Sequence, residues 1–534
     1  MRIFCLSSTT ASLIVSLVGV PCLLFSLQQP FCVATTPVPE KIFTNQLVDH
    51  LGEQGSDDSV WSQRYYTYNK YFGGPGSPIF LVFGGEGSIE PDVGIRYPFI
   101  SEHLARDFQA YVLQPEHRFY GKSQPLMNHT HHGTLTLTSA EYEYDDEDPR
   151  VRLFTAEQAL WDAMTLLQHI QQELGCSPNR SSPHYCPVIT VGGSYPGWLS
   201  AMARVVFPQF VDMAYSASAP MKFYAQQVNQ YDYYNHITKV AEKMIAGCSS
   251  AVRDVLLDVQ KKIVNGVAKE SDLGICPGTT PKYIDISTPD GLRFLADEVM
   301  MVVEYSFAND NMANYPPDNT TRLYQACQTF ASKKSPFENL QNFLIPRVGN
   351  ASENCWNMTN QLPTGHDATI TSGDWSGVGT GGDGESWDFQ TCTLLVEAIG
   401  LSSNASMFPP RDWSMDWLDD HCQKRFGVKP DPYQLVRRWK FDNLVAANVT
   451  RILFTNGLND GWSVGGIKTT LSESLIALNF PNGAHHSDLS GIGPTDQDTD
   501  DIKDGFHTIE AILGRWLQEV RHKSETEESS ISPQ

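Results

Sequence analysis

Residues 188–198 read Val-Ile-Thr-Val-Gly-Gly-Ser-Tyr-Pro-Gly-Trp, a largely β-branched run that stops abruptly in small residues around one serine. The run predicts a buried strand, and the pattern of residues 199–206 predicts a helix directly after it. A strand, a tight turn with a serine and a helix form the nucleophile elbow of an α/β-hydrolase, where the helix N-terminus favours developing negative charge. We therefore predict that Ser194 is a catalytic nucleophile; the alternative is an ordinary turn serine.

Composition places the chain among globular proteins. It has 534 residues, 41% hydrophobic and 19% charged, which allows a large core and more than one structural unit. The formal net charge of −23 argues against nucleic acid as a partner, because phosphate would be repelled. Such acidity suits a protein of the secretory pathway, secreted or lysosomal, that works at low pH.

Residues 1–34 predict a signal peptide. Arg2 supplies the positive start, residues 11–27 form an apolar stretch broken by Pro21, and residues 32–34 offer small residues for cleavage. The alternative is a signal anchor that stays in the membrane. The short, interrupted apolar run favours cleavage, and no other stretch is long and apolar enough to span a bilayer, so no membrane association is expected afterwards.

Cysteine usage agrees with export. Three of the 11 cysteines fall in the signal peptide, and the others form no C-x-x-C pair, so disulfides are their expected use. N-x-[ST] sequons predict a glycoprotein. The cysteines are Cys176, Cys186, Cys248, Cys276, Cys327, Cys355, Cys392 and Cys422, and the sequons begin at Asn128, Asn179, Asn319, Asn350, Asn357, Asn404 and Asn448.

Alternating strand and helix patterns predict an α/β fold, an α/β-hydrolase with a mainly parallel central sheet. Two extended, aromatic-rich segments before it, residues 43–51 and 61–71, predict an antiparallel edge. From about residue 221 helical patterns replace the strands, which predicts an inserted helical lid. The expected units are a signal peptide (1–34), a first hydrolase part (35–220), the lid (221–370), a second hydrolase part (371–522) and a disordered tail (523–534).

Two late strands supply candidates for the partners of the serine. A serine nucleophile needs a base, the base needs a carboxylate, and in α/β-hydrolases the order is Ser, acid, His, each after a strand. Asp460 and His485 follow the strands predicted at residues 451–455 and 475–480. Singly, each has an ordinary explanation in turn chemistry or solvation; together with Ser194 they predict a catalytic triad.

Three other segments carry glycines or charged residues that suggest either a site or an ordinary loop. Residues 84–87, Gly-Gly-Glu-Gly, follow a predicted strand and either donate an N–H to an oxyanion or form an ordinary turn. Residues 116–118, Glu-His-Arg, predict a structural network of charges in preference to a catalytic cluster. The glycine-rich residues 372–384 predict a loop, because the phosphate-binding pattern G-x-x-x-x-G-K-[ST] is missing.

Five short motifs are spread along the chain after the signal peptide, within matches that run from about residue 40 to 520. They are Gly-Gly-Ser-Tyr-x-Gly at 192–197, Glu-His-Arg-Phe-Tyr-Gly-Lys-Ser at 116–123, Trp-Asp-Phe-Gln-x-Cys-Thr at 387–393, Asn-Gly at 456–457 with Asp-x-Trp-Ser at 460–463, and Gly-Ala-His-His-x-Asp-Leu at 483–489. Together they resemble the serine carboxypeptidase family of lysosomal Pro-X carboxypeptidase and dipeptidyl peptidase 2. The resemblance implies an exopeptidase that cleaves peptides after proline; carboxypeptidase and dipeptidyl peptidase remain open.

The resemblance also implies roles for individual residues. Ser194 would be the nucleophile, Asp460 the acid and His485, the first of two histidines, the base. The N–H groups of Tyr195 and Gly85 would form the oxyanion hole. Trp462 and Trp198 would line a proline pocket, since a flat ring suits pyrrolidine. The implied disulfides are Cys248–Cys327, Cys276–Cys355 and Cys392–Cys422, which leaves Cys176–Cys186 as a local pair.

Two departures from the family pattern keep other functions open. Pro196 replaces the glycine that usually follows Ser-Tyr, and Leu394 replaces a glutamate after Cys-Thr. The alternatives are an esterase or lipase of the same fold, and a catalytically inactive secreted binding protein. We expect a peptide substrate as the partner. No cofactor or metal is expected, since no H-E-x-x-H or comparable cluster of ligands occurs. A homodimer is a possible assembly.

Overall fold

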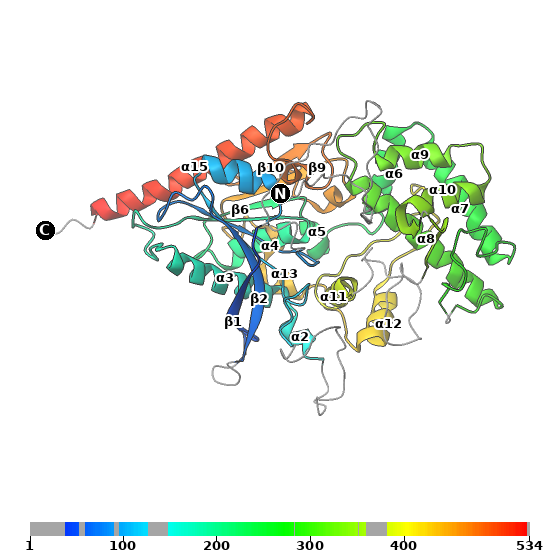
Figure 1. The fold of residues 1–534 in the computed structure, drawn as a ribbon, viewed down its shortest axis with the longest axis horizontal. Coiled ribbons are helices and arrows are strands. Elements are labelled where there is room, and N and C mark those ends of the chain that lie inside the picture. The colour runs from blue at the N-terminus through cyan, green and yellow to red at the C-terminus, as the bar shows by residue number, and fades with distance from the viewer. Residues whose placement is uncertain are drawn as a thin grey trace, which may run out of the picture.

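A mixed eight-stranded sheet forms the centre of the protein, in the order β1-β2-β4-β3-β5-β6-β9-β10 (Figure 1). The computed structural model describes residues 38–52, 59–89, 95–126, 148–281, 284–350, 352–358 and 382–530. β1 and β2 form the predicted antiparallel edge, β2 also runs antiparallel to β4, and the remaining neighbours are parallel. The strands are β1 (Lys41–Leu47), β2 (Val60–Tyr68), β3 (Ile79–Val82), β4 (Tyr111–Pro115), β5 (Val188–Gly193), β6 (Met213–Ala217), β9 (Ile452–Gly457) and β10 (Leu475–Phe480).

Helices cover both faces of the sheet, as the α/β class requires. Alternate residues of β3 point to opposite faces: Ile79 and Leu81 pack with α3 (Ala156–Glu173) and α4 (Tyr195–Val206), whereas Phe80 and Val82 pack with α15 (Asp500–Ser530). Figure 1 shows α3 and α15 on opposite sides of the strands. Because both faces of the sheet are buried, the central strands are continuous apolar runs. Such runs allow their positions to be predicted from the sequence.

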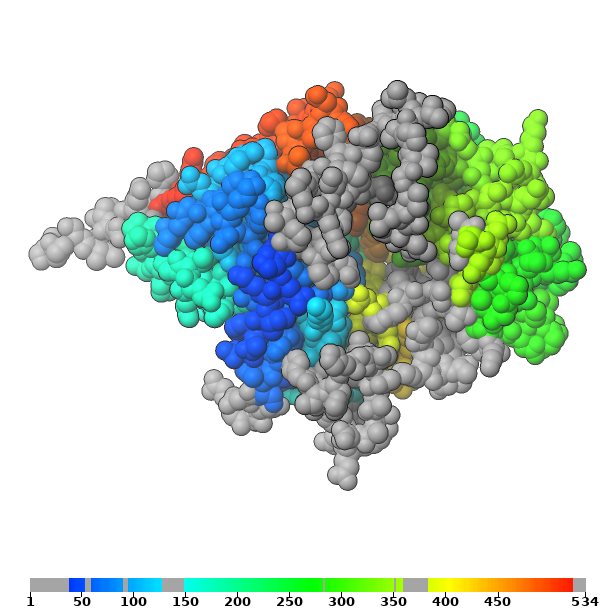
Figure 2. Space-filling model, in the orientation of Figure 1, coloured from blue at the N-terminus to red at the C-terminus, as the bar shows by residue number. Residues whose placement is uncertain are grey.

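A helical insertion separates β6 from β9. Its helices pack on one another and lie to one side of the sheet, in green in Figures 1 and 2. Its first part contains α5 (Met221–Tyr224), α6 (Asp232–Met244), α7 (Cys248–Val264), α8 (Pro289–Met312), α9 (Arg322–Phe330) and α10 (Pro336–Val348), followed by the short pair β7 (Gly349–Asn350) and β8 (Cys355–Trp356).

The insertion continues beyond residue 370, where the sequence predicted a return to the sheet. The chain forms α11 (Gly382–Thr391), α12 (Met415–Phe426) and α13 (Gln434–Trp439) before β9 begins at Ile452. α11 and α12 pack through Phe389 and Leu418 against Phe119 and Phe154, which belong to the sheet domain. The glycine-rich residues 372–384 follow the predicted boundary, and most of them, residues 372–381, lie outside the described residues.

All four predicted disulfides are present, and each joins segments that are neighbours in the fold. Cys176–Cys186 closes the connection between α3 and β5, and the other three brace the insertion. They are Cys248–Cys327 between α7 and α9, Cys276–Cys355, and Cys392–Cys422 between α11 and α12. Cross-links of this kind stabilise chiefly by restricting the unfolded chain.

The C-terminal helix is longer than predicted. α15 continues to Ser530, past residue 522, where the sequence predicted the start of a disordered tail. That expectation rested on polar composition, but lysine and glutamate are also good helix formers and extend an amphipathic helix at little cost. Residues 531–534 and the predicted signal peptide lie outside the described residues. In the described part of the chain, no helix combines the length and apolarity needed to cross a bilayer.

Most of the predicted glycosylation sites that the structure describes lie on the surface. Asn179, Asn319, Asn404 and Asn448 are exposed, whereas Asn357 is half-buried. Asn350 belongs to β7, and Asn128 lies outside the described residues.

Candidate active site

Ser194 occupies a strained turn between β5 and α4. Its backbone has φ 66° and ψ −133°, a region that costs a residue other than glycine about 1–3 kcal/mol. The turn is closed by hydrogen bonds from the Ser194 N–H to the Ala217 carbonyl (2.9 Å) and from the Trp198 N–H to the Ser194 carbonyl (3.1 Å). Gly192 must be glycine, because a Cβ there would overlap the Pro196 carbonyl. The geometry is that of a nucleophile elbow.

Pro196 does not disrupt this elbow. It is the second residue of α4, where a backbone N–H would have no intrahelical acceptor, so its absence removes no helical hydrogen bond. Its ring lies against Gly85, where a Cβ would be only 2.7 Å from the proline Cγ. The departure from the family pattern therefore leaves the turn intact and brings the loop after β3 close to the elbow.

Asp460 and His485 form a close pair. His485 Nδ1 lies 2.6 Å from Asp460 Oδ2, and the two side chains are 8% and 0% exposed. The other carboxylate oxygen, Oδ1, accepts a hydrogen bond from the Trp462 N–H at 3.0 Å. Because the carboxylate engages Nδ1 as an N–H donor, Nε2 remains as the basic nitrogen, the tautomer that a general base requires.

His486 has a different environment. Its ring lies against Gly193, the residue before Ser194, where a Cβ would lie 2.9 Å from His486 Cδ2. The centroids of the His485 and His486 rings are 4.5 Å apart, which places the acid–base pair beside the elbow. Within the described part of the chain, His486 Nδ1 is buried without a hydrogen-bond partner. Desolvation and the nearby charge of His485 hold the pKa of His486 well below its usual range, so this imidazole stays neutral.

The side chain of Tyr195 anchors the start of α4. His117 Nδ1 lies 2.7 Å from the Arg118 carbonyl, so it carries the proton, and Nε2 accepts the Tyr195 O–H at 3.0 Å. Gln390 of α11 donates to the same hydroxyl oxygen at 3.2 Å. Burial lowers the pKa of His117 to about 4, which keeps it a neutral acceptor at mildly acidic pH.

The Glu-His-Arg segment is a structural network, as predicted. The buried carboxylate of Glu116 accepts hydrogen bonds from Arg64 and from the Ser123 hydroxyl (2.8 Å). The Arg118 guanidinium binds both oxygens of Asp162, each at 2.6 Å. These pairs tie the loop after β4 to β2 and α3, and so fix the loop from which His117 contacts Tyr195.

The two predicted pocket tryptophans lie in different surroundings. Trp198 is fully buried among Tyr195, Tyr224 and Trp439, so its ring has no free face for a substrate and its predicted role is wrong for this structure. The reason is helical geometry, which turns a residue three after Tyr195 toward the core. Trp462 is only half-buried, and its ring lies 4.7 Å from that of Tyr233 in α6.

Leu394, which stands where the family has a glutamate, packs against the hydrophobic core. A carboxylate does occur three residues later, at Glu397, which is 7% exposed. Burial raises the pKa of Tyr224, and the charge of Glu397 adds to that shift. The region therefore still contains a buried acidic group, displaced along the chain.

Glu86, in the loop after β3, has no individual role predicted from the sequence. Glu86 is an exposed residue, yet desolvation of its carboxyl raises the pKa, while a backbone hydrogen bond and the charges of Arg96 and His485 act against this shift. Burial raises the pKa of Tyr97 and Tyr195, and the charge of Glu86 adds to both shifts. Its position next to Gly85 was the one signal that could have identified it.

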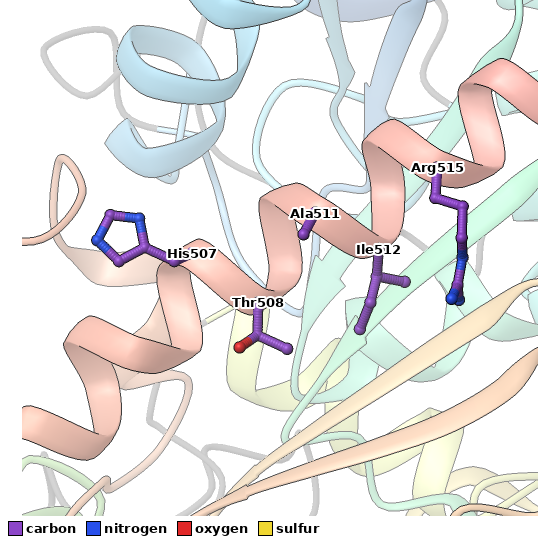
Figure 3. Close-up of a pocket in the computed structure, with 5 residues that line it drawn as sticks. All are labelled: His507, Thr508, Ala511, Ile512 and Arg515. Atoms are coloured by element: carbon purple, nitrogen blue, oxygen red, sulfur yellow. The ribbon is translucent and has the colours of Figure 1, made fainter.

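The described residues contain three groupings of potential metal ligands. Two of them include cysteines that are already in disulfides, Cys276 with Cys355 and Cys392. The third, His103 with Asp107 and Glu510, is a partly exposed set of ion pairs. A shallow hollow along α15 contains none of the predicted site residues; Figure 3 shows its lining side chains, His507, Thr508, Ala511, Ile512 and Arg515.

Comparison with known proteins gives one family. A family model described as serine carboxypeptidase S28 matches residues 46–505. Lysosomal Pro-X carboxypeptidase of Homo sapiens is 26% identical over 490 residues, which cover 90% of this chain and 87% of that protein. Thymus-specific serine protease of Mus musculus is 26% identical over 505 residues, with 91% and 89% covered. The crystal structure of a proline iminopeptidase of Mycobacterium smegmatis aligns with 86% of this chain and 97% of its own, at 11% identity and a TM-score of 0.30.

Proposed function

This chain belongs to the serine carboxypeptidase S28 family, and we propose that it is a serine exopeptidase that cleaves peptides after proline. The observation that carries the proposal is the Asp460–His485 pair at 2.6 Å, held beside the strained elbow of Ser194. A hydroxyl on such an elbow and an imidazole oriented by a buried carboxylate are what acyl transfer through a covalent enzyme intermediate requires.

In the proposed reaction, Ser194 Oγ attacks the scissile carbonyl carbon while His485 Nε2 accepts the hydroxyl proton. Asp460 stabilises the imidazolium, and the N–H groups of Tyr195 and Gly85 donate to the oxyanion. Collapse of the tetrahedral intermediate breaks the C–N bond, and His485 returns the proton to the leaving amine. Water then repeats the sequence on the acyl-enzyme. Neither a cofactor nor a metal takes part.

The preference for proline rests on the relatives and on Trp462. The human relative is named for carboxypeptidase activity on Pro-X substrates. Trp462 follows Asp460 by two residues, and its ring packs against Phe223 (5.3 Å) and Tyr233 (4.7 Å), an aromatic surface suited to a pyrrolidine ring. Two end specificities remain candidates within this proposal, release of a C-terminal residue and release of an N-terminal dipeptide. Acetylating the N-terminus or amidating the C-terminus of a proline peptide, one at a time, distinguishes them.

We also propose that the protein works in the secretory pathway, secreted or in lysosomes. Four disulfides suit an oxidising compartment, and the named human relative is lysosomal. The exposed sequons at Asn179, Asn319, Asn404 and Asn448 are the expected glycosylation sites. Treatment with an N-glycosidase should lower the apparent mass of the protein recovered from eukaryotic cells.

A fluorophosphonate probe tests the proposal directly. The wild-type protein should be labelled, and Ser194→Ala should abolish the labelling without loss of folding, because the probe reacts with an activated serine hydroxyl. A proline-containing peptide library, digested between pH 4 and pH 8, then gives the specificity. Failure to label a folded wild type would overturn the proposal. Ester turnover without cleavage of any proline peptide would favour an esterase of the same fold.

A further inference from the structure

The last turn of the inserted helix α8 lies between the two loops that carry Asp460 and His485. Asn311, in this turn, is completely buried. Its Nδ2 donates to the Asn459 carbonyl at 2.7 Å, and its Oδ1 accepts from the Gly461 N–H at 2.8 Å. One carboxamide therefore binds the backbone on both sides of Asp460.

These two hydrogen bonds constrain the direction of the Asp460 carboxylate. Oδ1 is held by the Trp462 N–H, so the path of the backbone around the aspartate decides where Oδ2 points. The insertion encloses the loop at the same place: a Cβ on Gly461 would lie 2.9 Å from the Tyr233 ring and 3.0 Å from the Ile237 side chain, both on α6. The acid loop is therefore packed against α6 on one side and held by the Asn311 carboxamide on the other, so removing the carboxamide frees one of its two supports.

The neighbouring residue of α8 holds the second loop. The Met312 carbonyl accepts a hydrogen bond from the His485 N–H at 3.1 Å. Consecutive residues of one helix end thus contact the loop of the acid and the loop of the base. Two features therefore fix the distance between the Asp460 and His485 side chains. One is the contact of both loops with the end of α8, and the other is the pairing of β9 with β10 in the sheet.

We propose that Asn311 is a positioning residue for the reaction, which acts through Asp460 and aligns it with His485. The inference rests on the proposed function. It gives the insertion a part in assembling the acid–base pair, in addition to any role as a cover over the strand ends. Positioning groups of this kind typically change rates by about 10- to 100-fold, since small displacements of catalytic groups are costly.

The test compares two buried asparagines of the insertion. Asn311→Leu removes both hydrogen bonds at similar volume. Asn339→Leu is the matched control: Asn339 is 1% exposed in α10, and its Oδ1 accepts from the Ser332 hydroxyl at 2.6 Å. Among the described residues, its side chain makes no hydrogen bond to the loop of the acid or the loop of the base. The rate of inactivation by a fluorophosphonate is measured for both, with the maximal rate and the half-saturating concentration separated, alongside the melting temperature.

We expect Asn311→Leu to lower the maximal inactivation rate by about 10- to 100-fold with little change in half-saturation, because alignment is lost and binding is not. Asn339→Leu should lose comparable thermal stability and keep its rate within about threefold. Equal rates for Asn311→Leu and wild type, or equal losses in both variants, overturn the proposal. If the folded wild-type protein is not labelled at all, the proposed function is wrong, and this inference, which rests on it, is wrong as well.

Asn311→Asp provides a rescue that depends on pH. A protonated carboxyl has the shape of the amide and can still donate to the Asn459 carbonyl, whereas an ionised one cannot. The titratable or charged groups around this helix end and the two loops are Asp460 with His485, Asp310 of α8 with Arg347, His236, whose Nε2 donates to the Leu458 carbonyl, and Lys243, which contacts Asn459 Oδ1. The ratio of variant to wild-type rate should rise toward one as pH falls. If the ratio of the Asn311→Asp rate to the wild-type rate does not change with pH, the proposal is overturned. This test remains valid even if Asn311→Leu fails to fold.

Discussion

His485 Nδ1 lies 2.6 Å from Asp460 Oδ2, whereas the adjacent His486 has no hydrogen bond to Nδ1 within the described part of the chain. The two histidines are neighbours in sequence and their rings are 4.5 Å apart, yet only the first is oriented by a carboxylate. This difference supports the proposal that His485, the first histidine of the pair, is the general base.

The first prediction separates these two histidines. His485→Gln should lower kcat on a proline peptide or an ester by about 10⁴-fold or more, because the general base is lost. His486→Gln should stay within about tenfold of wild type, since that ring packs against Gly193 and Tyr97 and is not oriented by a carboxylate within the described part of the chain. Steady-state kinetics of both variants check this; a larger loss for His486→Gln would reverse the assignment.

The second prediction concerns the space beside the elbow. Gly193→Ala should lower kcat at least tenfold, because the new Cβ meets the His486 ring at 2.9 Å and displaces the loop of the base. Gly514→Ala is the control. It lies in α15, where a Cβ would meet Phe108 at an ordinary 3.6 Å, so it should raise stability by about 0.5–1 kcal/mol and leave kcat unchanged.

The third prediction links stability to pH through Glu304. This carboxyl is buried in α8 with Oε2 2.5 Å from the Arg411 guanidinium, and burial raises its pKa to about 7 despite that neighbour. Because the folded state binds this proton more tightly than the unfolded state, the protonated carboxyl contributes its full share to the free energy of unfolding below the ordinary pKa of 4.5. This contribution is lost as pH rises through 7. The loss is on the order of 3 kcal/mol for such a shift.

Glu304→Gln cannot ionise and should flatten the dependence of melting temperature on pH between 4.5 and 7.5. Glu519→Gln, on the exposed face of α15, should keep the wild-type slope. Thermal unfolding in a pH series measures both; an unchanged slope in Glu304→Gln would show that this carboxyl does not control the neutral side of the profile.

The fourth prediction concerns the acidic side. Burial lowers the pKa of His117 to about 4, so its contribution to stability is present above its ordinary pKa of 6.5 and is lost as pH falls through 4. His117→Gln, whose amide does not titrate, should reduce the loss of stability between pH 6.5 and 4. The same thermal series checks this, and a steeper acid slope in the variant would contradict it.

The fifth prediction tests the anchor of Tyr195. Tyr195→Phe leaves His117 Nε2 and the Gln390 amide without their shared hydroxyl, which should cost about 1–3 kcal/mol in the free energy of unfolding. We expect kcat to fall less than tenfold, because the proposed oxyanion donor is the backbone N–H. Chemical denaturation and steady-state kinetics separate the two effects; a loss of activity at unchanged stability would assign the hydroxyl a direct role.

The elements of the sheet were predictable because parallel strands buried on both faces are short apolar runs. The elbow was predictable for a further reason. Only glycine fits at position 192, so the sharp turn that places Ser194 between β5 and α4 leaves a recognisable pattern of small residues in the sequence. The order of the strands was not predictable, since β3 lies between β4 and β5 and no local pattern records which strands pair.

The errors have identifiable physical causes. Trp198 was placed in the pocket by resemblance, although Tyr195, Trp198, Leu199 and Met202 follow helical spacing and all turn toward the core. Asn311 was missed because an asparagine at a helix end is unremarkable by itself. Its partners lie about 150 residues away, and only the folded chain brings them together.

Because α8 ends between the two loops, the helical insertion is not an independent module that can be exchanged. A chimera that takes its inserted helices from a relative, with the aim of transferring specificity, would also replace the carboxamide and carbonyl that contact residues 459, 461 and 485. Such a graft is expected to lose turnover before it changes preference. Substitutions around Trp462 that leave the last turn of α8 intact are the sounder route to altered selectivity.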